Sequence, residues 1–363
     1  MLNLTGVYHI ASGAESIAAR ARALAVEQSV EMPLEAITSA AVRDDIVGTV
    51  EDIRDLGGGT FEVRIALAAA TTGNEPGQIM NMLFGNASIL GDVTLVDAVF
   101  PAEMVSALPG PNIGIAGLKQ RVQATTRRAL TCSALKPQGL SPGELASLAA
   151  AMAEGGLDFI KDDHGLADQR YSPFAERVAA IALAIRATGA GTAYIPSLTG
   201  TLDDIRRGTA LARDNGLAAI MVAPMISGVA TLAAIARENP DMAVMAHPAL
   251  AGVARIAPAL LIGKLFRLFG ADAVVFPNHG GRFGYSREEC GRLAANARLA
   301  VQGKRDAIPV PAGGMTLDRV DEILDFYGPD TMLLIGGNLL SAGDRLTSEA
   351  RRLQERVAAH RYA

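Results

Sequence analysis

From about residue 128 onward, the sequence alternates eight times between a short β-rich run and a helical stretch. Each run ends in polar or glycine residues. The alternation predicts a parallel sheet, and eight units in about 230 residues fit a closed (β/α)8 barrel rather than the alternative, an open doubly wound sheet, which needs fewer strands. The runs are Ala129–Lys136, Phe159–Asp163, Ala193–Ser197, Ala219–Ala223, Ala243–His247, Ala273–Pro277, Ile308–Ala312 and Thr331–Ile335.

The helical stretches between these runs carry recognisable start signals. Ser141 and Ser286 each precede a glutamate by three residues, which is the spacing of a helix-capping box. The predicted helices begin near Ser141, Pro173, Leu202, Ala230, Pro258, Ser286, Leu317 and Ser341.

Residues 1–125 read as a separate α+β domain of ferredoxin-like type, preceding a barrel domain at 126–363. Apolar spacing predicts strands at 6–10, 46–54, 60–67 and 93–99, and helices at 15–28 and 76–84. Leu56–Gly59 separates the second and third strands and predicts a hairpin. The Pro/Gly-rich segment Pro109–Asn112 predicts a connection into the second domain.

Composition excludes several classes of protein. The formal net charge of −5 and the absence of a basic stripe argue against a nucleic-acid partner. Two widely separated cysteines do not make a disulfide scaffold, so a reducing compartment is the simpler context. Polar residues or prolines interrupt every apolar run before membrane-spanning length, and the first residues lack the pattern of a signal peptide. We therefore expect a cytoplasmic protein with no membrane partner.

Chemically useful side chains gather where the barrel strands end, which is where barrel enzymes place their active sites. Three of the five histidines fall there, His164, His247 and His279. The strand ends read Lys136-Pro-Gln138, Lys161-Asp162-Asp163-His164, His247, Asn278-His279-Gly-Gly-Arg282, Gly313-Gly314 and Gly336-Gly337.

The end of the second strand is the most charged of these. Lys161 and Asp163 are two residues apart, so both point to one side of the strand, and Asp163 offers the oxygen donor that Mg²⁺ prefers. Asp162 points the other way, and we expect it to pair with a neighbouring helix. A solvated turn or a plain Lys–Asp ion pair remains the simpler alternative.

The glycine pairs Gly313-Gly314 and Gly336-Gly337 follow the seventh and eighth strands. Barrels commonly bind phosphate there through backbone N–H groups, because a loop without side chains lets the phosphate approach closely. Each pair alone would be read as an ordinary turn, but together in this position they favour a phosphate site.

These motifs in this order resemble the large subunit of ribulose bisphosphate carboxylase (RuBisCO), and more closely the RuBisCO-like proteins that do not fix CO₂. The resemblance covers essentially the whole chain, and its most specific motif is Gly156-Leu-Asp-Phe-Ile-Lys161-Asp-Asp163. Glu27 and Asn86 in the first domain stand at family active-site positions.

The resemblance implies a role for each matching residue. Lys161 matches a lysine that CO₂ carbamylates to make a Mg²⁺ ligand, and Asp163 matches a second ligand. Lys136 matches a lysine that acts in enolisation, and His247 a histidine that contacts substrate. The glycines Gly314, Gly336 and Gly337, with Gly313, match phosphate-binding backbone. Glu27 and Asn86 would reach the site of a neighbouring subunit, which implies a homodimer with shared active sites or a higher oligomer of dimers.

The departures from the family are also informative. His164 stands where the family has its third metal ligand, a glutamate, so His164 is the candidate third ligand here. A nitrogen ligand suits Mg²⁺ poorly, so either the metal site is altered or water and substrate oxygens fill the gap. Arg282 aligns with the mobile-loop lysine, and Gln138 with the usual lysine partner of Lys136. Pro248 and Ala251 stand at the two positions where the family has the basic residues that hold a second phosphate. Carboxylation of a bisphosphate is therefore not expected.

We accordingly expect metal-stabilised enolate chemistry on a phosphorylated ketose. Lys136 would move the proton, and His247 or His279 would be the partner acid or base. Isomerisation of 5-methylthioribulose 1-phosphate in sulfur salvage is the first hypothesis. The alternatives are decarboxylation of a 3-oxo sugar-acid phosphate such as 3-oxo-isoapionate 4-phosphate, with Arg282 holding the carboxylate, and enolisation of a diketo-methylthiopentyl phosphate. A non-catalytic binding protein, with His164 marking a lost metal site, is the remaining class.

Overall fold

The computed structural model describes residues 2–362, which form two compact units. Within the described residues, one unit contains the chain up to Leu108 together with Leu250–Leu261, and the other contains Pro109–Ala249 and residues 262–362. No helix within 2–362 is both long and apolar enough to cross a membrane.

The first unit is an antiparallel sheet in the strand order β2-β3-β1-β4, which is the order of a ferredoxin-like domain and confirms the predicted class. Its hairpin turns at Gly57, Gly58 and Gly59, whose φ angles of 83°, 62° and 72° favour glycine. Short helices α2 and α4 were not predicted. The elements are β1 (Asn3–Ala11), α1 (Ile17–Glu27), α2 (Ala40–Asp45), β2 (Thr49–Gly57), β3 (Thr60–Ala68), α3 (Pro76–Phe84), β4 (Val93–Val99) and α4 (Ala102–Ala107).

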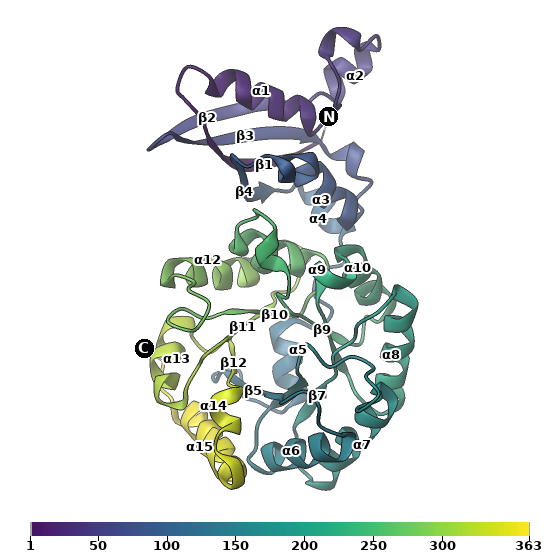
Figure 1. Cartoon of the computed structure of the whole chain (residues 1–363), viewed down its shortest axis with the longest axis vertical. Coiled ribbons are helices and arrows are strands. Elements are labelled where there is room, and N and C mark those ends of the chain that lie inside the picture. The colour runs from purple at the N-terminus through teal and green to yellow at the C-terminus, as the bar shows by residue number, and fades with distance from the viewer. Residues whose placement is uncertain (1, 363) are drawn as a thin grey trace. The chain divides into compact units, whose positions relative to one another are not determined.

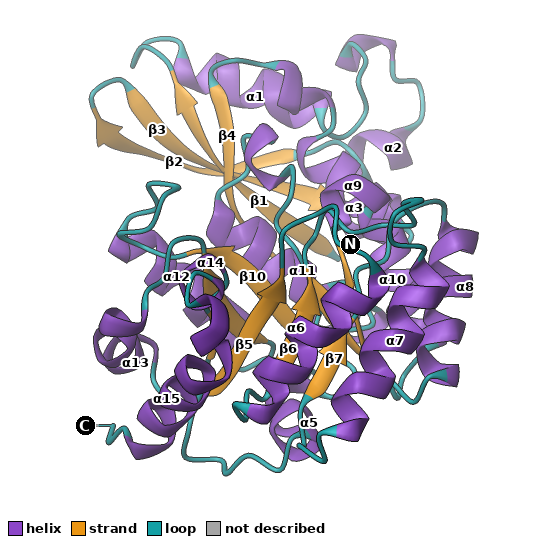
Figure 2. Cartoon of the chain, turned by 60° about the horizontal axis from the view of Figure 1, so that its bottom comes forward, coloured by secondary structure: helices purple, strands orange, loops and turns teal. Residues whose placement is uncertain are grey.

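The second unit is a closed barrel of eight parallel strands, as the repeat predicts, and not an open sheet (Figures 1 and 2). The strands form two rows, β11-β10-β9-β8 and β12-β5-β6-β7. Ser197, after β7, pairs with Met221 of β8, and β11 lies beside β12, so the ring closes. The strands are β5 (Leu130–Leu135), β6 (Phe159–Asp162), β7 (Ala193–Ile195), β8 (Ala219–Val222), β9 (Ala243–Ala246), β10 (Ala273–Pro277), β11 (Ile308–Ala312) and β12 (Met332–Leu334).

Helices surround this ring, and most begin where the sequence predicts (Figure 1). The Ser141–Glu144 capping box is formed, and Ser286 accepts from the N–H of Glu289 at 3.1 Å. The helix expected near Pro258 is instead a π-helix, Ala259–Leu265, that leads into α11. The helices are α6 (Pro142–Glu154), α7 (Phe174–Ala187), α8 (Leu202–Asp214), α9 (Pro224–Ser227), α10 (Val229–Glu238), α11 (Phe266–Leu268), α12 (Arg287–Arg298), α13 (Val320–Tyr327), α14 (Gly337–Leu340) and α15 (Leu346–Ala359).

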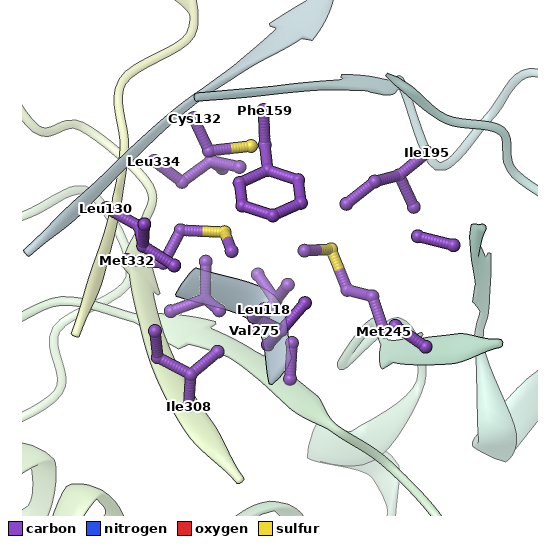
Figure 3. Packing of buried hydrophobic residues seen from close by; sticks show 14 of the residues in the cluster. Leu118, Leu130, Cys132, Phe159, Ile195, Met245, Val275, Ile308, Met332 and Leu334 are labelled. Carbon is purple, nitrogen blue, oxygen red and sulfur yellow. The ribbon is translucent and has the colours of Figure 1, made fainter. Parts of the chain in front are cut away.

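Helix α5 (Gly114–Arg121) belongs to the barrel, so the contacts divide the chain after Leu108 and not after residue 125 as we expected. Leu118 of α5 packs in one apolar cluster with Phe159, Met245 and other strand side chains (Figure 3). Buried Asp272 accepts hydrogen bonds from the N–H groups of Ile113 and Gly114 at 2.7 and 2.8 Å. Because Asp272 immediately precedes β10, α5 closes the amino end of the barrel and leaves the carboxyl end for the site.

Candidate active site

Four of the predicted site residues meet at the carboxyl ends of β5, β6 and β9: Lys136, Asp163, His164 and His247. Lys136 follows β5 directly, and His247 follows β9 directly. After β6 the chain turns back, with the N–H of Leu166 donating to the carbonyl of Asp163 at 3.0 Å. The turn fixes Asp163 and His164 at the rim of the barrel.

Asp163 is the anion of this cluster. Its Oδ2 lies 2.7 Å from Lys136 Nζ, and its Oδ1 accepts from the N–H of Gly165 at 2.9 Å. Burial pushes the pKa of Asp163 upward, but the hydrogen bonds from Lys136 and Gly165 and the neighbouring charge outweigh burial and lower the pKa to about 2. Asp163 is therefore a carboxylate throughout the physiological range, available to a cation or a proton donor.

Lys161 is a buried lysine beneath this carboxylate. Its side chain is 2 % exposed, and Nζ donates to the backbone carbonyl of Asp162 at 2.8 Å. Burial lowers the pKa of Lys161, although the charges of Asp163 and Asp162 oppose the shift. A lowered pKa favours the neutral amine, which is the form that reacts with CO₂.

Asp162 faces the opposite way and pairs with a neighbouring helix, as predicted. Its Oδ2 accepts from Arg177 Nε of α7 at 3.2 Å and from the N–H of Ser197 at 3.0 Å, and its Oδ1 accepts from the Tyr194 hydroxyl at 2.7 Å. Asp162 and Arg177 are both fully buried. No local sequence signal marked Arg177 or Tyr194 as its partners, because they come from separate elements.

His164 and His247 stack face to face. Their ring centroids are 4.2 Å apart and the planes differ by 7°. The N–H of Ala249 donates to His247 Nδ1 at 3.2 Å, so the neutral ring of His247 carries its proton on Nε2. Burial lowers the pKa of His247 to about 2, reinforced by the charge of Lys161, and burial also lowers the pKa of His164. Both rings are neutral at physiological pH.

The donor set fits a divalent metal ion in one form only. Within 2–362, no three His, Cys, Asp or Glu side chains are arranged to hold a metal. Asp163 supplies one carboxylate, whereas Lys161 supplies an amine that becomes an oxygen donor only as a carbamate. His164 Nδ1 lies 3.4 Å from Asp163 Oδ1, but a nitrogen is a poor ligand for Mg²⁺. The residues therefore fit Mg²⁺ when Lys161 is carbamylated.

A hydrogen bond links the two loops that carry the glycine pairs. Gly313 and Gly314 have φ angles of 83° and 101°, which disfavour any other residue. The N–H of Leu317 donates to Asn338 Oδ1 at 3.1 Å and so ties the loop after β11 to the glycines after β12. A Cβ on Gly281 would lie 2.3 Å from the carbonyl oxygen of Gly313, so the loop after β10 packs closely against the loop after β11.

Arg282 lies on the loop after β10. Its backbone N–H donates to the carbonyl of Gly313 at 3.1 Å, and its guanidinium lies 4.9 Å from the centre of the Phe283 ring. Its charge is among the influences that lower the pKa of His164. Arg282 therefore lies between the glycine loops and the histidine pair.

His279 is not brought to this cluster, although we expected it as an alternative acid or base. Its ring packs edge-on against Phe326 of α13 at 4.9 Å, and the Arg319 side chain donates to its backbone carbonyl at 3.3 Å. Its neighbours Asn278 and Tyr327 hydrogen-bond to each other. His279 thus packs between the barrel and α13, away from the cluster that contains His164 and His247.

Glu27 and Asn86 meet within the first unit. Asn86 Nδ2 donates to Glu27 Oε1 at 2.9 Å, and the Asn86 side chain is exposed. The two residues are 59 positions apart in the chain, so the fold of this unit brings them together.

Comparison with known proteins gives one consistent result. The family described as ribulose bisphosphate carboxylase large chain, catalytic domain, matches residues 114–359. A protein of Rhodospirillum rubrum named 5-methylthioribulose-1-phosphate isomerase is 55 % identical over 95 % of this chain and 94 % of its own length. Ribulose bisphosphate carboxylase-like protein 1 of Rhodopseudomonas palustris is 54 % identical over 97 % of both chains. A crystal structure of a Rubisco-like protein from Rhodopseudomonas palustris superposes with a TM-score of 0.93, at 53 % identity and 99 % coverage of both chains.

Proposed function

The chain belongs to the ribulose bisphosphate carboxylase large-chain family, and from that premise we propose that it isomerises 5-methylthioribulose 1-phosphate in sulfur salvage. The likeness to the Rhodospirillum rubrum isomerase over nearly the whole of both chains carries the proposal. The site residues support it, because they offer a proton-transfer lysine, a neutral histidine donor and one place for a phosphate.

The cofactor in this proposal is Mg²⁺ held by Asp163 and a CO₂-derived carbamate on Lys161. A divalent ion there supplies Lewis acidity to the ketone oxygen of the substrate. The burial of Lys161, which lowers its pKa, supports carbamate formation, and the low pKa of Asp163 supports its role as an anionic ligand. His164 was expected as a third ligand; the donor chemistry favours water or substrate oxygen in that position.

Lys136 moves the proton on the carbon next to the ketone. Its Nζ pairs with Asp163 Oδ2 at 2.7 Å. When Asp163 serves as a metal ligand, Lys136 loses part of that partner and can turn toward the substrate. His247 presents Nε2–H, because Nδ1 is held by the N–H of Ala249, and so donates to the oxygen of the enolised substrate.

The phosphate binds backbone N–H groups of Gly313, Gly314, Gly336 and Gly337, with Arg282 beside them. A second phosphate has no equivalent place, because Pro248 and Ala251 stand where the family holds it with basic side chains. A substrate with a phosphate at one end and an apolar methylthio group at the other matches a site that has one phosphate-binding place and lacks a second. For the same reason, together with Gln138 and Arg282, the chain is not a CO₂-fixing carboxylase.

We further propose that two copies share their active sites, with Glu27 and Asn86 of one serving the other. Their mutual hydrogen bond, in which Glu27 orients the exposed Asn86 amide, supports a polar contact to substrate. A cytoplasmic location is part of the same proposal, supported by two buried cysteines that are both free.

The test is incubation of the purified protein with Mg²⁺ and bicarbonate and each candidate substrate. We expect 5-methylthioribulose 1-phosphate to give an isomer of unchanged mass, followed by ¹H and ³¹P NMR. Release of CO₂ from 3-oxo-isoapionate 4-phosphate would favour the decarboxylase instead, and turnover of a diketo-methylthiopentyl phosphate alone would favour an enolase. Inertness toward all three would refute the proposal, and phosphate-ester binding without turnover would favour a binding protein.

The cofactor is tested separately by calorimetry. Mg²⁺ affinity should rise at least about tenfold when bicarbonate is added, and Lys161→Gln should abolish that rise. Equal Mg²⁺ affinity with and without CO₂ would exclude the carbamate.

A further inference from the structure

His164 occupies a position in which its ring does something other than bind a cation. The ring lies flat on His247, with centroids 4.2 Å apart and planes 7° from parallel. Such stacking restrains both rings, since rotation of either one about its Cβ–Cγ bond would separate the faces. Ligation of a metal would instead fix the His164 ring by the direction of a nitrogen lone pair.

The rest of the contacts around the pair hold each ring in place. His164 Nδ1 lies 3.4 Å from Asp163 Oδ1, which orients one edge of that ring. His247 Nδ1 accepts from the N–H of Ala249, which orients the other ring and leaves its proton on Nε2. The His247 side chain has one ring face on His164 and is half-buried, whereas the His164 side chain is 46 % exposed. His164 therefore covers His247 from the solvent side.

We propose that His164 is a positioning residue, whose ring clamps the His247 ring so that Nε2–H of His247 is held ready for the substrate oxygen, and that it is not a metal ligand. The inference rests on the proposed function for the use made of His247, but its structural part does not depend on the substrate. Stacking contacts of this kind are worth about 0.5–1.5 kcal/mol, enough to set a ring orientation. A flat apolar ring at position 164 can replace His164 in this role, whereas it cannot ligate a metal.

The test compares His164→Phe with His164→Ala in the full-length protein, with His9→Ala, on β1 of the first unit, as a control. We expect His164→Phe to keep kcat within about threefold of the parent and His164→Ala to lower kcat about tenfold or more, with KM changed less than about twofold in both. We expect Mg²⁺ affinity in the presence of bicarbonate to stay within about twofold in both variants. A role confined to folding would lower the unfolding temperature without this split between kcat and KM.

A second readout is independent of catalysis. The chain has five histidines, so histidine-selective ¹⁵N labelling gives few ring signals, and His9→Ala assigns one of them. In the parent and in His164→Phe, the His247 signals should show a single neutral form with the proton on Nε2. In His164→Ala, the two neutral forms should mix. If the proposed substrate is not turned over, the His247 spectrum still shows whether His164 positions the His247 ring.

Three outcomes would overturn the inference. A tenfold or greater loss of Mg²⁺ affinity in both variants would make His164 a ligand. An unchanged kcat together with an unchanged His247 spectrum in His164→Ala would remove the positioning role. If His164→Ala does not fold, His164→Phe decides alone: retained kcat and Mg²⁺ affinity support the inference, and loss of either refutes it.

Discussion

Asp162, the last residue of β6, and Asp163, which follows it, should have opposite effects on stability and activity when each loses its charge. Asp162 faces α7 and is fully buried with Arg177, whereas Asp163 faces the site and pairs with Lys136, whose side chain is 36 % exposed. The substitutions Asp162→Asn and Asp163→Asn are chemically identical and one position apart. Any difference between them therefore reports the two environments.

The cost of Asp162→Asn follows from its partners. Removing the charge leaves the Arg177 guanidinium buried without a counter-ion, which costs about 3–5 kcal/mol. An asparagine can still accept from Arg177 and Ser197 with its oxygen if its amide turns toward the Tyr194 hydroxyl, so the loss is mainly electrostatic. Asp163→Asn breaks a partly exposed pair and should cost about 1 kcal/mol or less. Activity should reverse this order, because Asp163 is the proposed metal ligand and Asp162 touches no substrate.

Urea unfolding followed by far-ultraviolet circular dichroism suits this chain, which contains no tryptophan. With an m-value of about 3 kcal/mol/M, Asp162→Asn should lower the midpoint of the barrel transition by about 1–2 M. Asp163→Asn should move it by less than about 0.5 M while lowering kcat about a hundredfold or more. An Asp162→Asn midpoint equal to that of the parent would show that Arg177 does not depend on the carboxylate and would refute the buried-pair reasoning.

The remaining predictions concern the proton, the phosphate and the closed end of the barrel. Lys136→Met should abolish exchange with D₂O at the carbon next to the ketone, with a loss of about a thousandfold in kcat, and surviving exchange would show that Lys136 is not the base. Gly281→Ala places a Cβ 2.3 Å from the Gly313 carbonyl, so kcat/KM should fall about tenfold or more, whereas the helical control Gly291→Ala should leave kcat/KM unchanged. Burial raises the pKa of Asp272 to about 6, despite its backbone hydrogen bonds. The folded protein thus binds this proton more tightly than the unfolded chain, whose pKa is about 3.9, and stability from Asp272 is present below pH 4 and lost as the pH rises through 6. The unfolding free energy of the parent minus that of Asp272→Asn should therefore fall by up to about 3 kcal/mol between pH 4 and 6.5, and a flat difference would contradict the shift.

The sequence determined the architecture. Eight β-rich runs separated by helical stretches required a parallel barrel, because local apolar periodicity reports which face of each element is buried. The same alternation placed Lys161 and Asp163 on one side of β6 and Asp162 on the other, and all three interact as that alternation predicts. The pair Gly313-Gly314 could be recognised in the sequence because both residues have positive φ angles, which few residues other than glycine adopt.

Only the tertiary structure decided which side chains meet. Lys136 with Asp163, and His164 with His247, come from separate strands whose ends approach only after the ring closes. His279, like His247, lies just after a barrel strand, yet it packs on α13, because the direction of a loop side chain depends on the helix beside it and not on local spacing. The assignment of α5 to the barrel also depends on tertiary contacts. The apolar face of α5 packs against side chains of the barrel strands, and the local sequence does not show this.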